Sequence, residues 1–202
     1  MDLVPLPKVP GSLSGYENEP GTFGSGTKSI VITFDDGYQD NFTRAFPIMK
    51  KFCFKATIFC IAGKIGREGY LDKDQIREMA KAGFEFGSHT ITHAELPNLK
   101  QEDKKKEIVL SKANLEKELN MKIDYFCYPK GLYDQESVEF VKAAKYAGAC
   151  SNEPGSNNGV MNPYFLKRTE IASHDSLFDF EKKLSGAYDF LHRILYQVRK
   201  RP

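Results

Sequence analysis

Residues 29–37 read SIVITFDDG, a β-branched apolar run that ends in two adjacent carboxylates and a glycine. Valine, isoleucine and threonine favour extended backbone, so residues 29–33 are expected to form a strand. Two carboxylates directly after such a strand are costly to bury unless something neutralises them. Successive side chains leave a strand in opposite directions, so Asp35 and Asp36 are expected to have different roles. One can ligate a metal ion while the other stays free beside it.

Strands and helices alternate along the rest of the chain. Further strands are expected at residues 56–61, 84–87, 125–128, 148–151 and 165–172, and helices at 41–51, 72–83, 102–119 and 135–146, with two more closing the chain. The helix at 72–83 has the clearest ends, because Asp72 with Gln75 fits an N-terminal capping box and Gly83 fits a C-cap. This alternation is typical of parallel β/α units, in either a barrel or an open sheet.

Length and composition are those of one globular domain. The chain has 202 residues, of which 41% are hydrophobic and 28% charged, and its net charge is +2. Such a balance gives no general field for nucleic acid. Residues 1–27 are rich in proline and glycine and are expected to form an irregular arm before a single domain at 28–202.

The N-terminus, the apolar stretches and the cysteines give information on the cellular location of the protein. Residues 1–5 lack a basic start followed by an apolar run, so no signal peptide is expected in this chain. No apolar stretch approaches the roughly 20 residues that span a bilayer. The four cysteines form no Cys-x-x-Cys pair and are expected to be buried free thiols. The location stays open between the cytoplasm and, after removal of an export signal, the cell envelope.

Two histidines follow the strand expected at residues 84–87, where a β/α fold gathers its ligands and catalytic groups. His89 and His93 are four residues apart, a spacing that places both rings on one side of a helical turn and is frequent in metal sites. With one carboxylate they leave coordination positions open for water and substrate. A metal with open positions polarises a carbonyl, and a free carboxylate supplies a general base. Hydrolysis of an amide or ester is therefore the expected reaction class.

Two motifs carry a resemblance to a known family. TFDDG at 33–37 and SHTITH at 88–93 resemble the first two motifs of NodB-homology polysaccharide deacetylases, carbohydrate esterase family 4. The ATIF run at 56–59 and the AGFEFG run at 82–87 fit as well, and the resemblance covers residues 29–184.

The resemblance implies a fold, a cofactor and a set of site residues. The fold would be a distorted (β/α) barrel of about six or seven parallel strands, complete or incomplete. One divalent metal ion, most often Zn²⁺ with Co²⁺, Ni²⁺ or Fe²⁺ as alternatives, would be held by Asp36, His89 and His93. Asp35 would be the general base that activates the attacking water.

The third family motif, Arg-x-Pro-Tyr-Gly, is matched by CYPKG at residues 127–131. The oxyanion donor of the family is a backbone N–H here, which Lys130 can supply, with Tyr128 beside it on the substrate side. The arginine that orients the base is missing. We expect Arg168, on a later strand, to pair with Asp35 instead; the alternative is an ordinary surface or salt-bridging arginine.

The remaining motifs are also altered. The chain has no tryptophan, so the Asp-x-x-x-Trp motif of the family is absent and one wall of the substrate groove differs. The histidine that protonates the leaving amine usually stands in a Leu-x-x-His motif. His174, which follows an apolar strand, is the candidate general acid, with a surface loop histidine as the alternative. His192 lies in an amphipathic pattern and is expected to be structural.

Together these features predict a hydrolase that removes N-acetyl groups from an amino-sugar polysaccharide or oligosaccharide. Two alternatives remain: a small-substrate amidohydrolase of the same fold, and a carbohydrate-binding pseudoenzyme that keeps the metal. The loop at 151–163 is modest in length, which favours an open groove and a glycan. A pure binding module would have no need for Asp35, which favours an enzyme.

Overall fold

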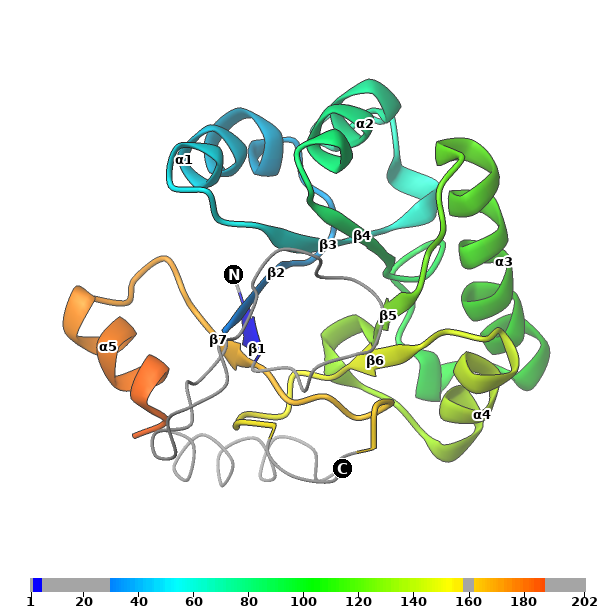
Figure 1. Cartoon of the computed structure of the whole chain (residues 1–202). Coiled ribbons are helices and arrows are strands. Elements are labelled where there is room, and N and C mark those ends of the chain that lie inside the picture. Colours follow the sequence, from blue (N-terminus) through cyan, green and yellow to red (C-terminus); the bar gives the residue numbers. More distant parts are fainter. Residues whose placement is uncertain (1, 5–29, 158–161, 188–202) are drawn as a thin grey trace, which may run out of the picture.

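The computed structural model describes residues 2–4, 30–157 and 162–187, which form a curled sheet with helices on its outer face (Figure 1). The strands are β1 (Asp2–Val4), β2 (Val31–Phe34), β3 (Ala56–Cys60), β4 (Glu85–Ser88), β5 (Tyr125–Cys127), β6 (Gly148–Cys150) and β7 (Thr169–Glu170). Their order is β6-β5-β4-β3-β2-β1-β7, and every ladder from β2 to β6 is parallel. The distorted (β/α) barrel is thereby confirmed in its incomplete form, with five strands paired in parallel among the described residues.

Two antiparallel ladders extend the sheet beyond β2. β1 pairs with β2 on one side and with β7 on the other. The sequence places Asp2–Val4 in an irregular arm, but these residues form β1 because both neighbouring strands offer partners for their backbone groups. The rest of the arm expected at 1–27, and the expected start of the domain at residue 28, lie outside the described residues.

The segment after β6 turns the sheet toward closure. Ala149 N donates to Pro163 O at 2.8 Å, and Leu166 N donates back to Ala149 O at 2.9 Å. The same segment then joins β1 on the far edge as β7. Of the strand expected at 165–172, only Thr169–Glu170 is regular strand, because the residues before it pair with β6 through the single bridge of Cys150 and Leu166.

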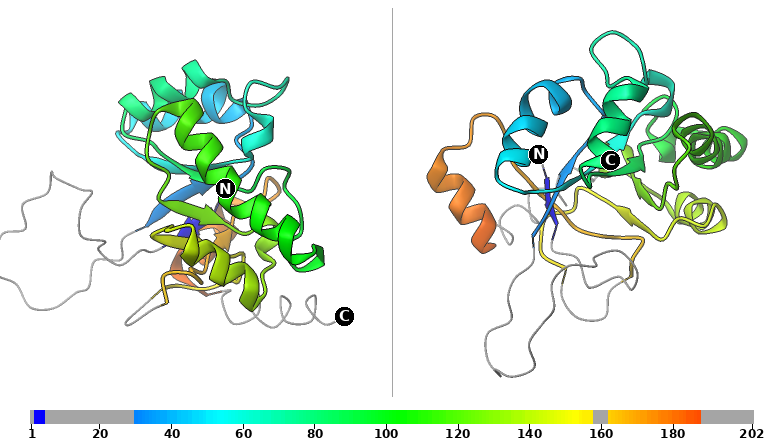
Figure 2. Two further views of the ribbon diagram at one scale, coloured as in Figure 1. Left: turned by 90° about the vertical axis from the view of Figure 1, so that its right-hand side faces the viewer. Right: turned by 45° about the horizontal axis from the view of Figure 1, so that its top comes forward.

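The helices that connect the strands lie on the outside of the sheet (Figures 1 and 2). They are the π-helix η1 (Asn41–Ala45), α1 (Phe46–Lys51), the 3₁₀ turn η2 (Ala62–Lys64), α2 (Lys73–Lys81), η3 (Leu96–Asn98), α3 (Gln101–Leu119), η4 (Pro129–Gly131), α4 (Gln135–Ala143) and α5 (Leu177–Ser185). The capping box of α2 is confirmed, since Asp72 accepts from Gln75 N at 2.8 Å and Gln75 accepts from Asp72 N at 3.1 Å. No helix in the described ranges has the length and apolar character to cross a bilayer.

Apolar side chains fill both faces of the curled sheet. The outer core joins strands to helices through fully buried residues, among them Ile58, Phe86, Phe126, Ile76, Met79, Ile108 and Leu115. A smaller cluster of Phe59, Cys127, Cys150 and Leu166 comes from the opposite sides of the strands and fills the inside of the barrel. Burial on both faces is what a parallel sheet requires. Three of the four cysteines are buried as expected; Cys53 is exposed, in the turn after α1.

A buried ion pair joins α3 to α4. Lys104 on α3 is 3% exposed, and its ammonium donates to the carboxylates of Asp134 and Glu136, the latter at 2.8 Å. Asp134 also caps α4 by accepting from Ser137 N at 2.8 Å. Burial alone would raise the pKa of Asp134, but the hydrogen bonds from Lys104 and Ser137 outweigh it and the pKa is lowered.

Replacing Asp134 by alanine should lower the free energy of unfolding at pH 7 by about 1–3 kcal/mol, because the change removes a helix cap and one partner of a buried ammonium. The folded-state pKa of Asp134 is lowered, so this contribution is complete above the unfolded value of about 4 and is lost as the pH falls through the folded value. Urea unfolding of both proteins from pH 7 to pH 3 should show the difference shrinking below about pH 4. Asp74→Ala, which removes an exposed pair with Arg77, is the matched control and should change little. A difference that stays constant down to pH 3 would contradict this account.

Candidate metal centre and catalytic groups

The two adjacent carboxylates lie in a tight turn at the carboxyl end of β2. Gly37 N donates to Asp35 O at 2.9 Å, and both Asp36 (φ 68°) and Gly37 (φ 73°) have left-handed backbone. A Cβ atom at Gly37 would lie 3.0 Å from the sulfur of Cys60, so glycine is required for space as well as for conformation. The turn points Asp35 at Arg168 and Asp36 at the two histidines.

Asp36 faces both histidines that follow β4. Its Oδ1 lies 3.7 Å from His89 Nε2 and 3.5 Å from His93 Nε2, and the possible ligand atoms of the three residues lie within 4.8 Å of one another. The other nitrogen of His89, Nδ1, is 2.7 Å from Cys127 O. A carbonyl can only accept, so Nδ1 carries the proton and Nε2 is left to ligate. Burial lowers the pKa of His89, which favours the neutral, ligating form of its ring.

The backbone between the histidines is strained rather than helical. A helical turn was expected from the four-residue spacing, and this is wrong: Thr90 and His93 both have φ of 65°, in the left-handed region. That conformation is unfavourable for a β-branched threonine. The structure compensates for the strain with a hydrogen bond from His93 N to Thr90 Oγ1 at 3.0 Å.

Glu107, on α3, holds the same loop from outside. Its carboxylate accepts from Ile91 N at 2.8 Å, from Thr92 N at 3.0 Å and from the Thr92 hydroxyl at 2.8 Å. Sequence reasoning missed this residue, because within the charged sequence of α3 it is indistinguishable from a solvated surface residue. Only the docking of α3 against the loop after β4 shows its function as a support for the histidines.

The geometry of the Asp36, His89 and His93 group fits a divalent cation. Asp36 Oδ1 is buried and has no hydrogen-bond partner among the described residues. A buried carboxylate oxygen is unfavourable in that state, and a cation at this point would satisfy it. One carboxylate and two imidazoles are the donor set of a catalytic site that keeps positions open for other ligands.

A second group, Asp35, His89 and Cys127, also has ligand atoms within 4.8 Å of one another. Here Arg168 occupies both oxygens of Asp35, and its Nη2 lies 3.1 Å from the Cys127 sulfur. A divalent cation would have to sit against this guanidinium, which repels it. The first group is therefore the better candidate for a divalent cation.

Arg168 makes a two-pronged ion pair with Asp35 inside the barrel. Nη1 and Nη2 donate to the two carboxylate oxygens at 2.8 and 2.7 Å, and the arginine is 1% exposed. Nε donates to Ser151 O at 3.0 Å, and Nη2 also donates to the Asn152 side chain. Burial alone would raise the pKa of Asp35, but the charge and hydrogen bonds of Arg168 hold it well below its usual range. Asp35 is thus ionised and fixed in orientation beside the candidate metal group.

The residue at position 127 accounts for the use of Arg168, an arginine from a distant segment, as the partner of Asp35. Cys127 stands where the third family motif has its arginine, and its fully buried sulfur contacts the guanidinium of Arg168. Its sulfur also lies 3.5 Å from Asp35 Oδ2. The small thiol leaves room that the Arg168 side chain fills from the segment before β7. The sequence shows the loss of the motif arginine, but only the fold brings the two positions together.

Three other expected site residues differ from one another in burial and in contacts. Lys130 has left-handed backbone (φ 55°) in η4 and its ammonium pairs with Glu95. Tyr128 is 0% exposed and packs on Phe126, with ring centroids 5.3 Å apart, so its side chain belongs to the core and does not face the substrate side. His174 is exposed in the turn between β7 and α5, and it belongs neither to the group around Asp36 nor to the lining of the cleft beside the carboxylates. His192 lies outside the described residues.

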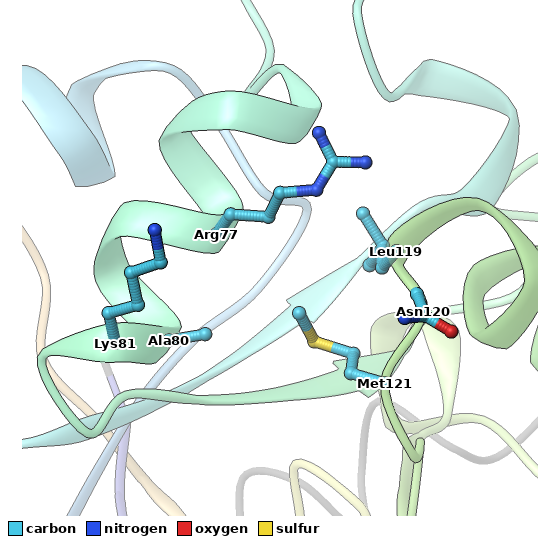
Figure 3. A pocket seen from close by; sticks show the side chains of 6 residues that line it. All are labelled: Arg77, Ala80, Lys81, Leu119, Asn120 and Met121. Carbon is cyan, nitrogen blue, oxygen red and sulfur yellow. The ribbon is translucent and has the colours of Figure 1, made fainter.

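Two hollows within the described part of the chain have similar size. A cleft of about 540 Å³ runs beside the carboxylates, lined by Phe34, Asp35, Asp36, Tyr38, Asp40, Asn41, Arg44, Ala45, Ile48, Asn152 and Glu170. The other, of about 480 Å³, lies between α2 and the end of α3 and is lined by Arg77, Ala80, Lys81, Leu119, Asn120 and Met121 (Figure 3). The second lining has no carboxylate, histidine or cysteine, so the catalytic groups belong to the first.

A curled β/α sheet with a metal-ligating group and a separate, ion-paired carboxylate at its strand ends defines a class of hydrolase-like barrels. Comparison with known proteins makes the class specific: the family model for polysaccharide deacetylases matches residues 24–149. The chain belongs to the polysaccharide deacetylase family, as its first two motifs predict.

Individual relatives agree with this assignment. The chain is 35% identical over 145 residues to YxkH of Bacillus subtilis, and 29% identical over 191 residues to the poly-β-1,6-N-acetyl-D-glucosamine N-deacetylase of Staphylococcus aureus. These matches cover 72% and 86% of this chain, and 52% and 64% of the relatives, so the chain spans less than two thirds of either relative. The structure of the Streptococcus pyogenes deacetylase PplD in complex with acetate superimposes with a TM-score of 0.71 at 28% identity, covering 76% of this chain and 69% of that one.

Replacing His89 by alanine should abolish stoichiometric binding of Zn²⁺, because two remaining protein ligands seldom hold a catalytic metal tightly. Metal content after dialysis, measured by atomic emission, gives the result directly. His174→Ala is the matched control, since this exposed histidine is not a member of the candidate ligand group and its loss should leave the metal content as it is. One equivalent of zinc retained by the His89 variant would rule out the assignment.

Proposed function

We propose that this chain is a metal-dependent N-deacetylase, which hydrolyses the acetamide of an amino-sugar polysaccharide or oligosaccharide. The observation that carries the proposal is that the two adjacent carboxylates have different contacts. Asp36 faces His89 and His93 and has a buried oxygen without a hydrogen-bond partner among the described residues, whereas both oxygens of Asp35 accept hydrogen bonds from Arg168, which keeps Asp35 ionised. A purely structural metal site has no use for the second carboxylate.

The relatives support the reaction and the substrate class. The Staphylococcus aureus relative is named for removing acetyl groups from β-1,6-linked N-acetylglucosamine, and PplD is a deacetylase whose structure holds acetate. Acetate is the small product that an N-deacetylase releases. We therefore propose an acetylated amino-sugar glycan as the partner of this chain.

Asp36, His89 and His93 are proposed as the ligands of one divalent cation, with Zn²⁺ first and Co²⁺, Ni²⁺ or Fe²⁺ as alternatives. When bound, such a cation polarises the acetyl carbonyl and makes a water molecule easier to deprotonate. Asp35 is proposed as the base that takes the proton from the attacking water. Arg168 keeps Asp35 ionised at neutral pH and holds its oxygens in place, as a positioning residue for the base.

Two groups complete the proposed chemistry. The backbone N–H of Lys130, in the left-handed turn of η4, is proposed to donate to the oxyanion that forms from the acetyl carbonyl. Tyr128 contributes through its place in this turn, because its side chain is buried in the core. His174 is proposed to protonate the leaving amine. His174 lies four residues after Glu170, the last residue of β7, on the segment that carries Arg168.

Acetate release from oligomers of β-1,6-linked N-acetylglucosamine tests the proposal, with Zn²⁺ or Co²⁺ supplied. The wild-type chain should release acetate, and Asp35→Asn should lower turnover by roughly 10² to 10⁴, the range for loss of a general base. His174→Ala should lower it by a similar factor if His174 is the acid. No acetate from the wild-type chain would leave the carbohydrate-binding pseudoenzyme as the better account, and release only from small amides would favour the amidohydrolase.

Replacing Arg168 by methionine should move the acidic limb of the pH profile of kcat/KM to higher pH. In the wild-type chain the pKa of Asp35 is held low, so the base is ionised throughout the neutral range. Without the guanidinium, burial is left to raise the pKa of Asp35, and the base is then protonated at a pH where the wild-type base is not. Arg168→Lys restores a charge without the two-pronged geometry and should give an intermediate profile. An Arg168→Met profile with lower rates but an unmoved acidic limb would mean that Arg168 only supports the fold.

A further inference from the structure

The cleft beside Asp36 extends away from the metal group, over a wall that the proposed chemistry does not use. This wall begins one residue after the Asp36-Gly37 turn and consists of Tyr38, Asp40, Asn41 and Arg44. Asn41 opens η1, a five-residue π-helix in which Phe46 N donates to Asn41 O. Wide π turns of this kind occur mostly as local insertions and frequently at functional sites.

Asn41 lines the cleft and has a buried side-chain oxygen, Oδ1, without a hydrogen-bond partner in the described part of the chain. The residue as a whole is only 7% exposed. Its Nδ2 donates to the neighbouring carboxylate of Asp40 at 3.4 Å. The amide nitrogen therefore has a partner, and the amide oxygen is the atom that lacks one among the described residues. A buried amide oxygen without a donor destabilises the fold, so its retention needs an explanation. A ligand with a hydroxyl or amide N–H would supply the missing donor.

Tyr38 gives the same wall an apolar surface. It is 46% exposed and stacks on Tyr70, with ring centroids 5.2 Å apart and planes at 28°. A bridge between the backbones of Tyr38 and Tyr70 fixes the pair in place. An exposed ring that is held rigidly can pack against an apolar ligand face at little cost in side-chain entropy.

Charged groups surround this surface on both sides. Arg44 offers hydrogen-bond donors from η1, and Asp40 and Glu170 offer acceptors from the two sides of the cleft. A pyranose ring has the complementary chemistry, because it carries hydroxyl donors and acceptors at its rim and C–H groups on its faces. A cleft that combines few convergent polar groups with an aromatic surface is the usual form of a small-molecule site.

We propose that this wall is a subsite for the sugar residue adjacent to the one that loses its acetyl group, with Asn41 Oδ1 accepting a hydrogen bond from that sugar and Tyr38 packing on its apolar face. The inference rests on the proposed deacetylase function. It adds the path of the glycan, which would extend from the metal group across η1. The subsite selects an oligomer over an isolated acetyl donor.

Kinetics on two substrates test the subsite. One substrate is a pentamer of β-1,6-linked N-acetylglucosamine, and the other is 4-nitrophenyl acetate, an acetyl donor too small to span the cleft. Asn41→Leu should lower the ratio of kcat/KM for the pentamer to that for the ester by about tenfold, the effect of one lost hydrogen bond. Tyr38→Ala should lower the same ratio. Phe52→Ala is the matched control, because Phe52 is also an accessible aromatic residue, 59% exposed, in the turn that precedes β3 at the opposite end of the barrel.

A binding measurement separates this inference from the proposed function. In the Asp35→Asn background, calorimetric titration with the pentamer should give a Kd about tenfold higher when Asn41→Leu is added. Thermal unfolding of Asn41→Leu should show no loss of stability, since the change removes an unsatisfied buried amide. If the wild-type chain releases acetate but both variants keep the wild-type ratio and Kd, the subsite is wrong and the function stands. If no acetate is released from either substrate, the proposed function itself fails.

Discussion

The ion pair between Asp35 and Arg168 is the interaction on which the rest of the site depends. Two carboxylates at one strand end repel each other and resist burial, and the arginine resolves this for one of them with two parallel hydrogen bonds. Asp36 is then left with a buried oxygen that a cation can satisfy. The same pair also ties the segment before β7 to the end of β2, residues 133 positions apart in the sequence. The same ion pair therefore orients Asp35 and helps to hold the two sides of the curled sheet together.

Strain near the ligands is the second constraint. Asp36, Thr90 and His93 all have left-handed backbone, which is unfavourable for residues other than glycine. The surroundings hold each in place: Ala62 N donates to Thr90 O at 2.9 Å, and Glu107 binds the two amides between the histidines. Such support fixes the atoms that we propose as ligands, so the proposed metal binding needs little reorganisation. The same proposal gives Glu107, on α3 and distant in sequence, a part in metal affinity.

Much of this architecture could be predicted from the sequence, because its signals are local. Apolar runs bounded by turn residues predicted β2 to β6, and the Asp72–Gln75 capping box predicted the start of α2. The two motifs identified the family, which the family model confirms over residues 24–149. The different partners of the two carboxylates also followed from local sequence, since neighbouring side chains on a strand diverge.

What could not be predicted depends on contacts between distant segments. The strand at Asp2–Val4 forms only because β2 and β7 offer partners on both sides, so composition alone suggested an irregular arm. The spacing of His89 and His93 suggested a helical turn, whereas tertiary support from Glu107 permits a strained loop. Arg168 was a candidate on chemical grounds, but the room that Cys127 leaves for its guanidinium is visible only in the fold. Asn41 carried no signal at all, because an unsatisfied amide can be recognised only from its surroundings.

Anomalous diffraction from crystals of the chain grown with Zn²⁺, recorded on both sides of the zinc edge, tests the central claim most directly. This account predicts one strong peak bounded by Asp36, His89 and His93, with Asp35 outside the coordination sphere and still paired to Arg168. A peak bounded instead by Asp35, His89 and Cys127, with Arg168 displaced, would contradict the division of roles between the two carboxylates.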